Sequence, residues 1–495
     1  MIKGSQSTLY GTDAVAGVIN LISATPSAEP FSAVSTLSYG SFNTFQGSIG
    51  VSGSPAKEVQ YHLSYQRDSS DGFSAASAPD EGSDFSNDGY QRNSLFGRVE
   101  VQVGSSMILT PYLNYSENSG DYDGGAFTDA DNRYMLEMIH PGIRTEYRSG
   151  DFRIRGDYGF TQTNRLFESE LGTNEFEGRF HDADLYADLS FGEYVTVLGG
   201  FNYQDYAIPV SAEGEEDRRA WIKSPYLTFY LKNLHGFSAE LGYRLNRHSE
   251  YGNNSTYSLA PSYYLLDNLK LYASVTSGFK VPTPDELFGP FGANEDLDPQ
   301  RSRYINAGLE TYLMDRRLKA GFQVFSRKIN DLIIFTFDQG YINRDEQNDR
   351  GVEVTADWLI GKSLNTGVWY NYTDGEITEV TNDGNVTRSN LIRRPKHSIG
   401  LDLAADLSEK WTVRVNGEWN GERTDLYFNP ANNFIAENVK LDPYTLVNLY
   451  TEYRLAKPDI TFFADVKNLL NTDFTEVYGF NTMGTALKAG VKVRF

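Results

Sequence analysis

Apolar and polar residues alternate one by one through the last eleven residues of this chain, TALKAGVKVRF at 485–495. Leu487, Val491 and Phe495 belong to one set of this alternation, and two lysines and an arginine belong to the other. In a β-strand a period of two sends the two sets to opposite faces of the sheet. We therefore expect a strand with one apolar face and one cationic face, ending on an aromatic residue.

The same alternation recurs along almost the whole chain. Comparable strands are predicted at 59–66, 95–103, 269–277, 318–327, 352–360, 399–407, 412–419, 445–455 and 460–467. A soluble β-sandwich also alternates, but its strands are shorter and its polar face carries shorter side chains. Runs with bulky charges fit the roughly 9–11 residues that a strand needs to cross a bilayer around a polar lumen. The sequence therefore predicts an all-β fold, a transmembrane antiparallel β-barrel.

The connections between these strands alternate between tight turns and long polar loops. The long loops fall at 68–90, 117–139, 207–219, 279–301, 375–394 and 421–442. Short turns at one rim and long loops at the other are typical of outer-membrane barrels. Counting on this basis gives about 22 strands, a size found in plugged barrels, whereas an open porin channel has roughly 16–18.

Composition further narrows the possible classes of protein. The chain has 33 Tyr, 30 Phe and 5 Trp, no cysteine, and a net charge of -22. It contains no run of about 18 apolar residues that could form a membrane helix, and its acidity argues against nucleic acid as a partner. The six histidines form no HExxH or similar cluster, and no serine-centred nucleophile motif stands out. We therefore expect no enzymatic activity.

The first residues do not follow the barrel pattern. They are rich in glycine, and Val15 to Ile22 form a continuous apolar run without alternation. Such a run predicts a buried strand of a globular element, although an ordinary first barrel strand is the alternative. We divide the chain into a separate element at 1–26 and a transmembrane barrel at 27–495.

That opening segment resembles the end of the plug domain in TonB-dependent outer-membrane receptors, where the pattern is roughly RGPxSxLYGxxAIGGVINIIT. The match includes Gly4, Tyr10, Gly11, Gly17 and Asn20. Further resemblance is carried by SGFKVPTPDELFGPFGANEDLDPQ from residue 277, RGVEV from 350, RRPKHSIGLDL from 393, and VKNLLNTDFTEVYGFNTMG from 466. Among these receptors the last stretch is most similar to those for cobalamin.

The resemblance implies a receptor in the outer membrane of a Gram-negative bacterium, crossing its lipid many times. It would actively transport a large scarce nutrient, cobalamin or a ferric siderophore, with TonB as partner of the full-length protein. Phe495 would be the signal read by the barrel-assembly machinery. We expect this chain to retain only the end of the plug, without an export signal or TonB box. A passive porin remains the alternative.

The resemblance also implies calcium in the external loops, since the cobalamin receptors order two such loops around Ca²⁺. The corresponding positions here are Asp84, Asp88, Asp123 and Asp131, all in acidic segments. Calcium prefers hard oxygen ligands, usually about six to eight of them. The alternative is that these carboxylates are simply solvated. No other cofactor is expected.

Three arginines, Arg393, Arg394 and Arg423, lie where long loops meet strands. Arginine can bind carboxylate, amide or phosphate groups with two parallel hydrogen bonds. We expect these side chains to contact the nutrient at the external mouth. Salt bridges to the many Asp and Glu residues of the lumen are an equal alternative.

Overall fold

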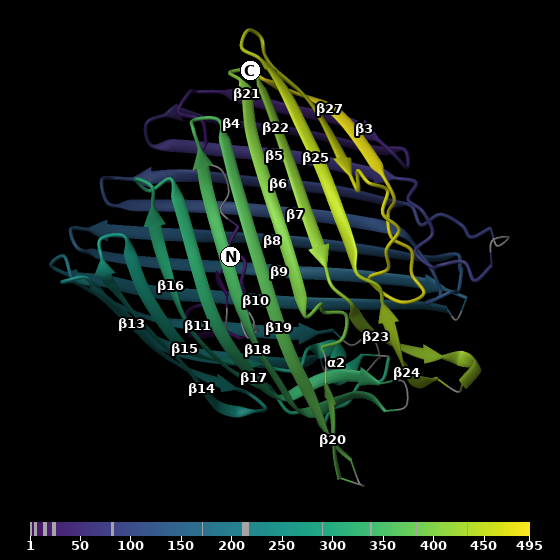
Figure 1. Cartoon of the computed structure of the whole chain (residues 1–495). Helices are drawn as coiled ribbons and strands as arrows, with labels where there is room; N and C mark the ends of the chain where they lie inside the picture. Colours follow the sequence, from purple (N-terminus) through teal and green to yellow (C-terminus); the bar gives the residue numbers. More distant parts are fainter. Residues whose placement is uncertain are drawn as a thin grey trace.

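The computed structural model describes residues 2–3, 7–12, 17–21, 26–80, 84–170, 172–209, 217–289, 291–336, 339–381, 384–389, 391–432 and 434–495. Within these ranges the chain is almost entirely β-strand, and the strands form a closed barrel (Figure 1). No helix in the described part is long or apolar enough to span a membrane.

The barrel wall has 22 antiparallel strands in the described residues, as the sequence predicted. The first eleven are β3 (Ser32–Gly40), β4 (Thr44–Ala56), β5 (Val59–Ser70), β6 (Tyr90–Val103), β7 (Met107–Tyr122), β8 (Asn132–Ser149), β9 (Phe152–Ser169), β10 (Gly172–Phe191), β11 (Val195–Ile208), β12 (Arg218–Leu234) and β13 (Phe237–His248). The others are β14 (Gly252–Leu266), β15 (Leu269–Lys280), β16 (Gln300–Leu313), β17 (Leu318–Thr336), β18 (Gly340–Ile360), β19 (Leu364–Thr381), β21 (His397–Ser408), β22 (Trp411–Asn420), β25 (Tyr444–Leu455), β26 (Asp459–Lys467) and β27 (Ala486–Arg494).

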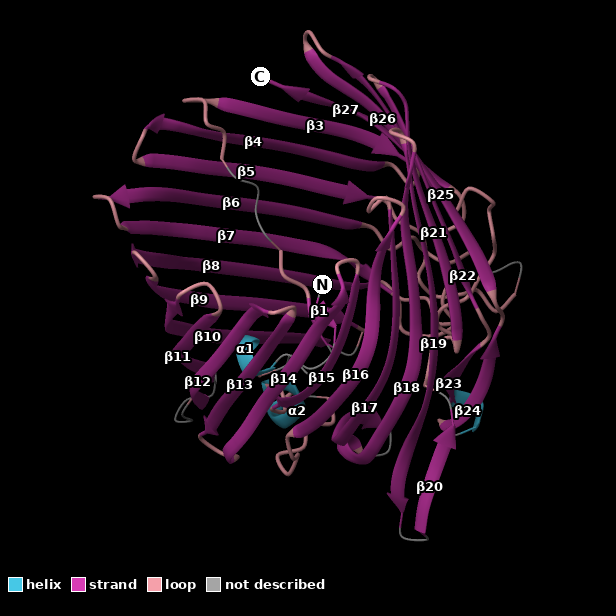
Figure 2. Ribbon diagram, turned by 60° about the vertical axis from the view of Figure 1, so that its left-hand side comes forward, coloured by secondary structure: helices cyan, strands magenta, loops and turns pink. Residues whose placement is uncertain are grey.

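Two short hairpins project from the wall. β20 (Gly384–Ser389) pairs with the outer end of β19, and β23 (Arg423–Asn429) pairs with β24 (Ile435–Leu441), with a 3-10 turn, η1 (Pro430–Asn432), between them. Both hairpins stand at the same end of the barrel in Figure 2.

Alternation along each strand separates an apolar outer face from a polar inner face. On β12, Leu227 and Phe229 are exposed on the outside. Ser224 and Thr228, which have the opposite parity, are fully buried on the inside. An exposed apolar band around a closed sheet is stable only when lipid covers it. The wall therefore carries the lipid-facing surface that the sequence predicted.

The C-terminal strand follows the predicted orientation. Val491 pairs with Leu37, which is half exposed on the outer face, and Lys488 reaches Gln46 at 3.3 Å on the inner face. Lys492 has the same parity as Lys488 and shares its inner face. β27 pairs with β3 and so closes the barrel.

The two rims of the barrel differ. One rim, here called the turn rim, carries tight links at 57–58, 104–106, 150–151, 192–194, 235–236, 267–268, 314–317, 361–363, 409–410 and 456–458. The opposite loop rim carries the long connections, including 71–89, 123–131, 281–299, 421–443 and 468–485. In outer-membrane barrels the long loops face the outside of the cell.

The described N-terminal residues lie outside the barrel sheet. β1 (Ile2–Lys3) pairs with β2 (Gly17–Val18), and α1 (Ser7–Tyr10) rests against the inner faces of β13, β14 and β15 (Figure 2). Ser7 is fully buried there and accepts a hydrogen bond from Phe279 N at 3.3 Å. Contrary to the expected burial of the apolar run, Ile19 is 71% and Leu21 89% exposed, because these residues meet no apolar neighbour in the described lumen.

Candidate functional site

The loop at 281–299 folds into the barrel mouth around a short helix, α2 (Pro284–Phe288). Thr283 caps this helix: its hydroxyl accepts from Glu286 N, and the Glu286 carboxylate accepts from Thr283 N. This reciprocal pair satisfies two backbone donors that would otherwise be free, and Pro284 supplies a backbone angle already suited to a first helical turn. The sequence TPDEL therefore fixes a helix where a long loop would otherwise be irregular.

Side chains hold this loop to both sides of the opening. Arg165 of β9 pairs with Asp285 at 2.5 Å, and Arg218 of β12 pairs with Glu295 at 3.3 Å. On the opposite side Asn343 of β18 accepts from Asp298 N at 2.7 Å. The loop thus contacts strands that precede and strands that follow it in the wall.

Two adjoining cavities flank α2, one of about 670 Å³ and one of about 420 Å³. Both are bordered by Tyr206, Ile208, Thr283, Pro284 and Phe288. The larger cavity opens between α2 and the inner faces of β8 to β11, and the smaller one between α2 and β12 to β13.

The walls of the larger cavity combine aromatic rings with an arginine. Phe176, Phe180 and Tyr206 line it together with Arg165. The guanidinium of Arg165 lies 5.1 Å from the centre of the Phe176 ring, and Phe180 stacks on Tyr206 at 4.8 Å. Such a surface binds a largely apolar ligand and orients it through a few polar groups. Sequence reasoning missed this site, although the capping signature at 283–286 could have located its helix.

The predicted calcium residues are brought together only in part. Asp88 contacts Asp123, and each carboxylate also accepts a backbone hydrogen bond, from Ala75 N at 2.6 Å and Ala76 N at 2.5 Å respectively. Burial raises the pKa of Asp88 to about 6, and the neighbouring Asp123 adds to the rise. Burial opposes ionisation of Asp123 as well, but hydrogen bonds from Ala76 N and from Ser74 hold its pKa below the usual range.

The other two predicted calcium ligands are not part of this pair of carboxylates. Asp84 and Asp131 are exposed, and the described residues contain no group of three or more His, Asp or Glu side chains arranged to hold a metal. The expected convergence of four aspartates is therefore absent. Asp88 Oδ1 is buried without a hydrogen-bond donor among the described residues, which is the one feature here that fits a cation.

Arg393 and Arg394 both face aspartates. Such salt bridges are the alternative that we named to a role of these arginines in ligand binding. Arg393 Nε donates to Asp425 at 2.7 Å, and Asp425 is fully buried. Arg394 lies 3.9 Å from Asp349, and burial together with the nearby Arg327 lowers the pKa of its guanidinium. Neither arginine borders the cavities beside α2. Their contact with a nutrient stays a prediction.

Arg423 is buried, with 5% of its surface exposed. It donates to the carbonyl of Asp442 at 2.8 Å and lies 4.6 Å from the centre of the Tyr444 ring. Its Nε is buried and donates no hydrogen bond within the described residues. The side chain therefore anchors the base of the β23–β24 hairpin, and a role in ligand binding also stays a prediction.

The residues of the N-terminal motif are described in part. Gly4 and the side chain of Tyr10 lie outside the described residues. Gly11 has a φ of 86° and packs so closely on Arg244 that a Cβ would lie 3.2 Å from the guanidinium, which explains glycine here. Gly17 lies in β2 and Asn20 is exposed.

Phe495 exchanges backbone hydrogen bonds with Ala33, at 2.8 and 3.2 Å, and its side chain is 76% exposed on the outer face. This exposure leaves the terminal ring accessible. Its reading by the assembly machinery stays a prediction.

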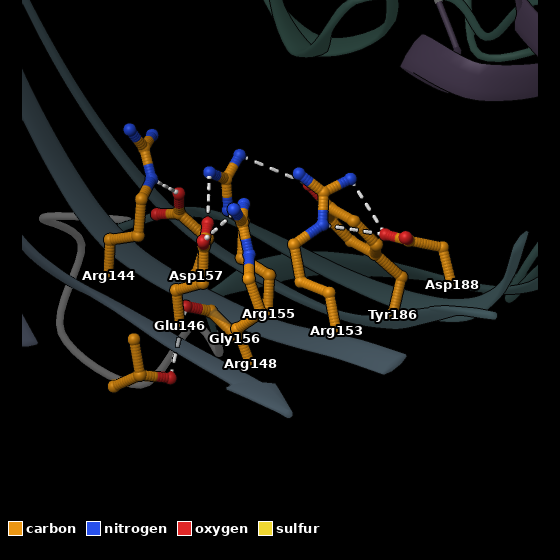
Figure 3. Close-up of polar contacts among 10 residues, drawn as sticks. Arg144, Glu146, Arg148, Arg153, Arg155, Gly156, Asp157, Tyr186 and Asp188 are labelled. Carbon is orange, nitrogen blue, oxygen red and sulfur yellow. Dashed lines mark hydrogen bonds and ion pairs between the residues drawn. The ribbon is translucent and has the colours of Figure 1, made fainter. Parts of the chain in front are cut away.

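A ladder of arginines occupies the inner wall near the turn rim (Figure 3). Arg144 pairs with Asp157 at 2.6 Å, Arg155 with Glu146 at 2.6 Å, and Arg153 with Asp188 at 2.7 Å. The fourth arginine is Arg148, which pairs with Glu146 at 3.2 Å. Because each cation has a carboxylate partner, the ladder holds β8, β9 and β10 together. It is separate from the two cavities beside α2, here called the mouth cavities.

Comparisons with known proteins agree with this architecture. A family model described as TonB dependent receptor-like, beta-barrel matches residues 112–469. The vitamin B12 transporter BtuB of Photobacterium profundum is 25% identical over 509 aligned positions, covering 100% of this chain and 79% of the relative. BtuB of Vibrio cholerae is 24% identical over 507 positions with the same coverage.

Two solved structures show the same fold at low sequence identity. The siderophore receptor PirA from Acinetobacter baumannii superposes with a TM-score of 0.83 at 15% identity, covering 100% of this chain and 84% of the other. A mutant of the ferric enterobactin receptor PfeA from Pseudomonas aeruginosa superposes with a TM-score of 0.81 at 17% identity, with coverage of 100% and 84%.

Proposed function

This chain belongs to the TonB-dependent receptor β-barrel family of Gram-negative outer membranes, and from that membership we propose that it takes up a large scarce nutrient, cobalamin or a ferric siderophore. Energised uptake through TonB is part of the proposal for the whole protein. Members of this family are transporters and receptors and not enzymes.

The cavity beside α2 is the observation that carries the proposal. It lies at the loop rim, which faces the outside of the cell, and it joins an aromatic wall with Arg165. Loop 281–299 closes one side of it through the ion pair between Arg165 and Asp285, which an anionic ligand group can displace because Asp285 is itself a carboxylate. A nutrient arriving from outside therefore meets both an apolar surface and an exchangeable cation.

The barrel size supports a gated receptor over the alternative of a passive porin. Porins with an aqueous channel have roughly 16–18 strands, whereas barrels of about 22 strands hold a plug. The 22 strands of the described wall match the second class. The segment at 2–21, with its described parts inside the barrel, is proposed to belong to such a plug.

Calcium at Asp88 and Asp123 is proposed as a device for ordering loops 71–89 and 123–131. A cation between the two carboxylates would offset their mutual repulsion and would satisfy the buried Asp88 Oδ1. Two carboxylates fall short of the roughly six to eight oxygens that Ca²⁺ takes, so backbone carbonyls or water would complete the shell.

Calorimetric titration of the detergent-solubilised chain tests the proposed function. Cyanocobalamin, a ferric tris-catecholate and haem are titrated separately into the wild-type chain and into the variants Phe176→Ala and Arg165→Gln. We expect one ligand to bind and both variants to weaken it at least about tenfold, because a buried ring or a desolvated charged contact typically contributes more than 1.4 kcal/mol.

Arg148→Gln is the matched control, since it removes an arginine from the inner wall of β8 near the opposite rim. It should leave the affinity unchanged. An affinity that is unchanged in both cavity variants, or no binding of any of the three ligands, would rule out this site.

A further inference from the structure

A third cavity, of about 830 Å³, opens on the outer surface of the barrel near the loop rim. Most of the strand residues that line it, on β5 to β9, have the same parity as the exposed apolar residues of the band below. On β5, Arg67 and Ser69 follow the exposed Leu63 and Tyr65. Since side chains alternate along a strand, all four point away from the lumen. This cavity therefore faces the membrane surroundings and is distinct from the mouth cavities.

The position of the cavity relative to lipid is set by tyrosines. Tyr39 and Tyr65 are exposed on the outer face, and their hydroxyls donate to Asn43 at 2.6 Å and Asn93 at 2.9 Å. Tyrosine at such a site marks the boundary between hydrocarbon and head groups. Ser69 lies four residues beyond Tyr65, or about 13 Å along the strand at about 3.3 Å per residue. The cavity thus begins at the level where the head groups of the outer leaflet lie.

The lining offers paired hydrogen-bond donors and acceptors. Arg67 donates to Gln91 at 3.2 Å, and Arg133 pairs with Asp121 at 3.3 Å while 74% of its side chain stays exposed. Glu168 lies directly across the strand pair from Arg133. A simple anion would meet repulsion from these carboxylates. A sugar satisfies both kinds of group, because each hydroxyl donates one hydrogen bond and accepts others.

The lower wall of the cavity is apolar. Met135 is 45% exposed there, and Leu166 pairs with it across β8 and β9. A wall that is polar toward the loop rim and apolar toward the lipid band matches a ligand with a saccharide head and acyl chains. A free sugar would leave this wall exposed to water.

We propose that this outer cavity binds the phosphorylated saccharide head group of a glycolipid in the outer leaflet. The sugar hydroxyls donate to Asp121 and Glu168. The guanidinium groups of Arg67 and Arg133 contact phosphate and sugar oxygens, as arginine does in bidentate pairs. The acyl chains then continue down over Met135 and the apolar band.

Native mass spectrometry of the detergent-solubilised full chain tests the proposal with three probes. These are rough lipopolysaccharide, its core oligosaccharide freed from lipid, and phosphatidylglycerol. We expect the wild-type chain to retain rough lipopolysaccharide at least about tenfold more strongly than either other probe. Equal retention of phosphatidylglycerol would show a non-specific lipid surface, and equal retention of the free oligosaccharide would show a soluble sugar site; either result overturns the proposal.

Variants locate the binding. The double variant Arg67→Gln, Arg133→Gln should lose this preference, and so should Ser119→Trp, which fills the cavity without changing charge. Arg247→Gln is the control, since Arg247 is exposed on the outer face of β13 at the same rim but outside the cavity. Heat-modifiable mobility on a denaturing gel verifies that each barrel is folded. Undiminished retention by both folded cavity variants overturns the proposal.

Discussion

Asp88 and Asp123 show how two neighbouring carboxylates acquire pKa shifts of opposite direction. Asp88 is held by one hydrogen bond from Ala75 N, whereas Asp123 accepts from Ala76 N and from Ser74. The group with more donors holds its charge more strongly, and the other binds a proton more readily, because two adjacent carboxylates resist double ionisation. Titration of Asp88 therefore makes the loops above β5 to β8 sensitive to pH.

We expect the packing of loops 71–89 and 123–131 to weaken as the pH rises through 6. The pKa of Asp88 is higher in the folded loop than in an unfolded chain, so its contribution is complete at low pH and is lost as the pH rises through about 6. The lowered pKa of Asp123 means that its charged form stabilises the folded loops at pH values above the ordinary range of an aspartate. This stabilisation is lost only in strong acid. Hydrogen exchange at Ala75 and Ala76, corrected for intrinsic rates, should show less protection at pH 8 than at pH 5.

Asp88→Asn separates the proton from the calcium proposal. It should remove the pH dependence and stabilise the loops by about 1 kcal/mol at pH 8, a value kept small because the site is partly exposed. Millimolar Ca²⁺ should restore protection at pH 8 in the wild-type chain and not in the variant. Identical exchange profiles for both chains would contradict this role of Asp88.

At the scale of one element, α2 depends on its cap. Thr283→Ala removes the hydroxyl that accepts from Glu286 N and should destabilise the helix by about 1 kcal/mol. Faster hydrogen exchange at Leu287 and Gly289, whose amides donate to Thr283 and Asp285 carbonyls, would record this loss. Loop 123–131 serves as the internal control. Unchanged exchange in α2 would mean that the ion pairs alone hold the loop.

The terminal strand β27 allows a direct comparison of its two faces. Val491→Arg places a charge in the lipid-facing band, whereas Lys492→Ala removes one from the lumen. We expect the first substitution to lower the free energy of unfolding by about 2–4 kcal/mol more than the second if the site lies at mid-bilayer. Denaturant unfolding of the barrel in lipid vesicles measures both. A larger loss for Lys492→Ala would reverse the assignment of the faces.

For the whole molecule, the lumen is expected to conduct ions in this chain. Among the described N-terminal residues, α1 rests on β13 to β15 and leaves the opposite inner wall to solvent or to further plug residues. With a net charge of -22 the pore should prefer cations. Planar-bilayer recordings in a KCl gradient test this through the sign of the reversal potential. Anion selectivity, or a sealed bilayer, would disagree with this picture.

The sequence was a reliable guide to the barrel and a poor one to its sites. Alternation assigns each strand residue to a face, so the strand number and the orientation of Lys488 and Val491 were predicted correctly. The mouth cavity draws residues from β8 to β13 and from α2, and neither strand tilt nor loop path can be read from a period of two. For the same reason Asp88 and Asp123 meet while Asp84 and Asp131 do not.

The seam between β27 and β3 gives this barrel an order of assembly. Every other neighbouring pair in the wall is close in sequence, but Val491 must find Leu37. In an unfolded chain, closing so long a loop costs about 3 kcal/mol more than closing a ten-residue hairpin, and contacts of such separation form slowly. We therefore expect the wall to grow hairpin by hairpin as an open, edge-exposed sheet, and its first and last strands to meet in the final step. An open sheet edge cannot persist in hydrocarbon, so this step commits the chain to the membrane.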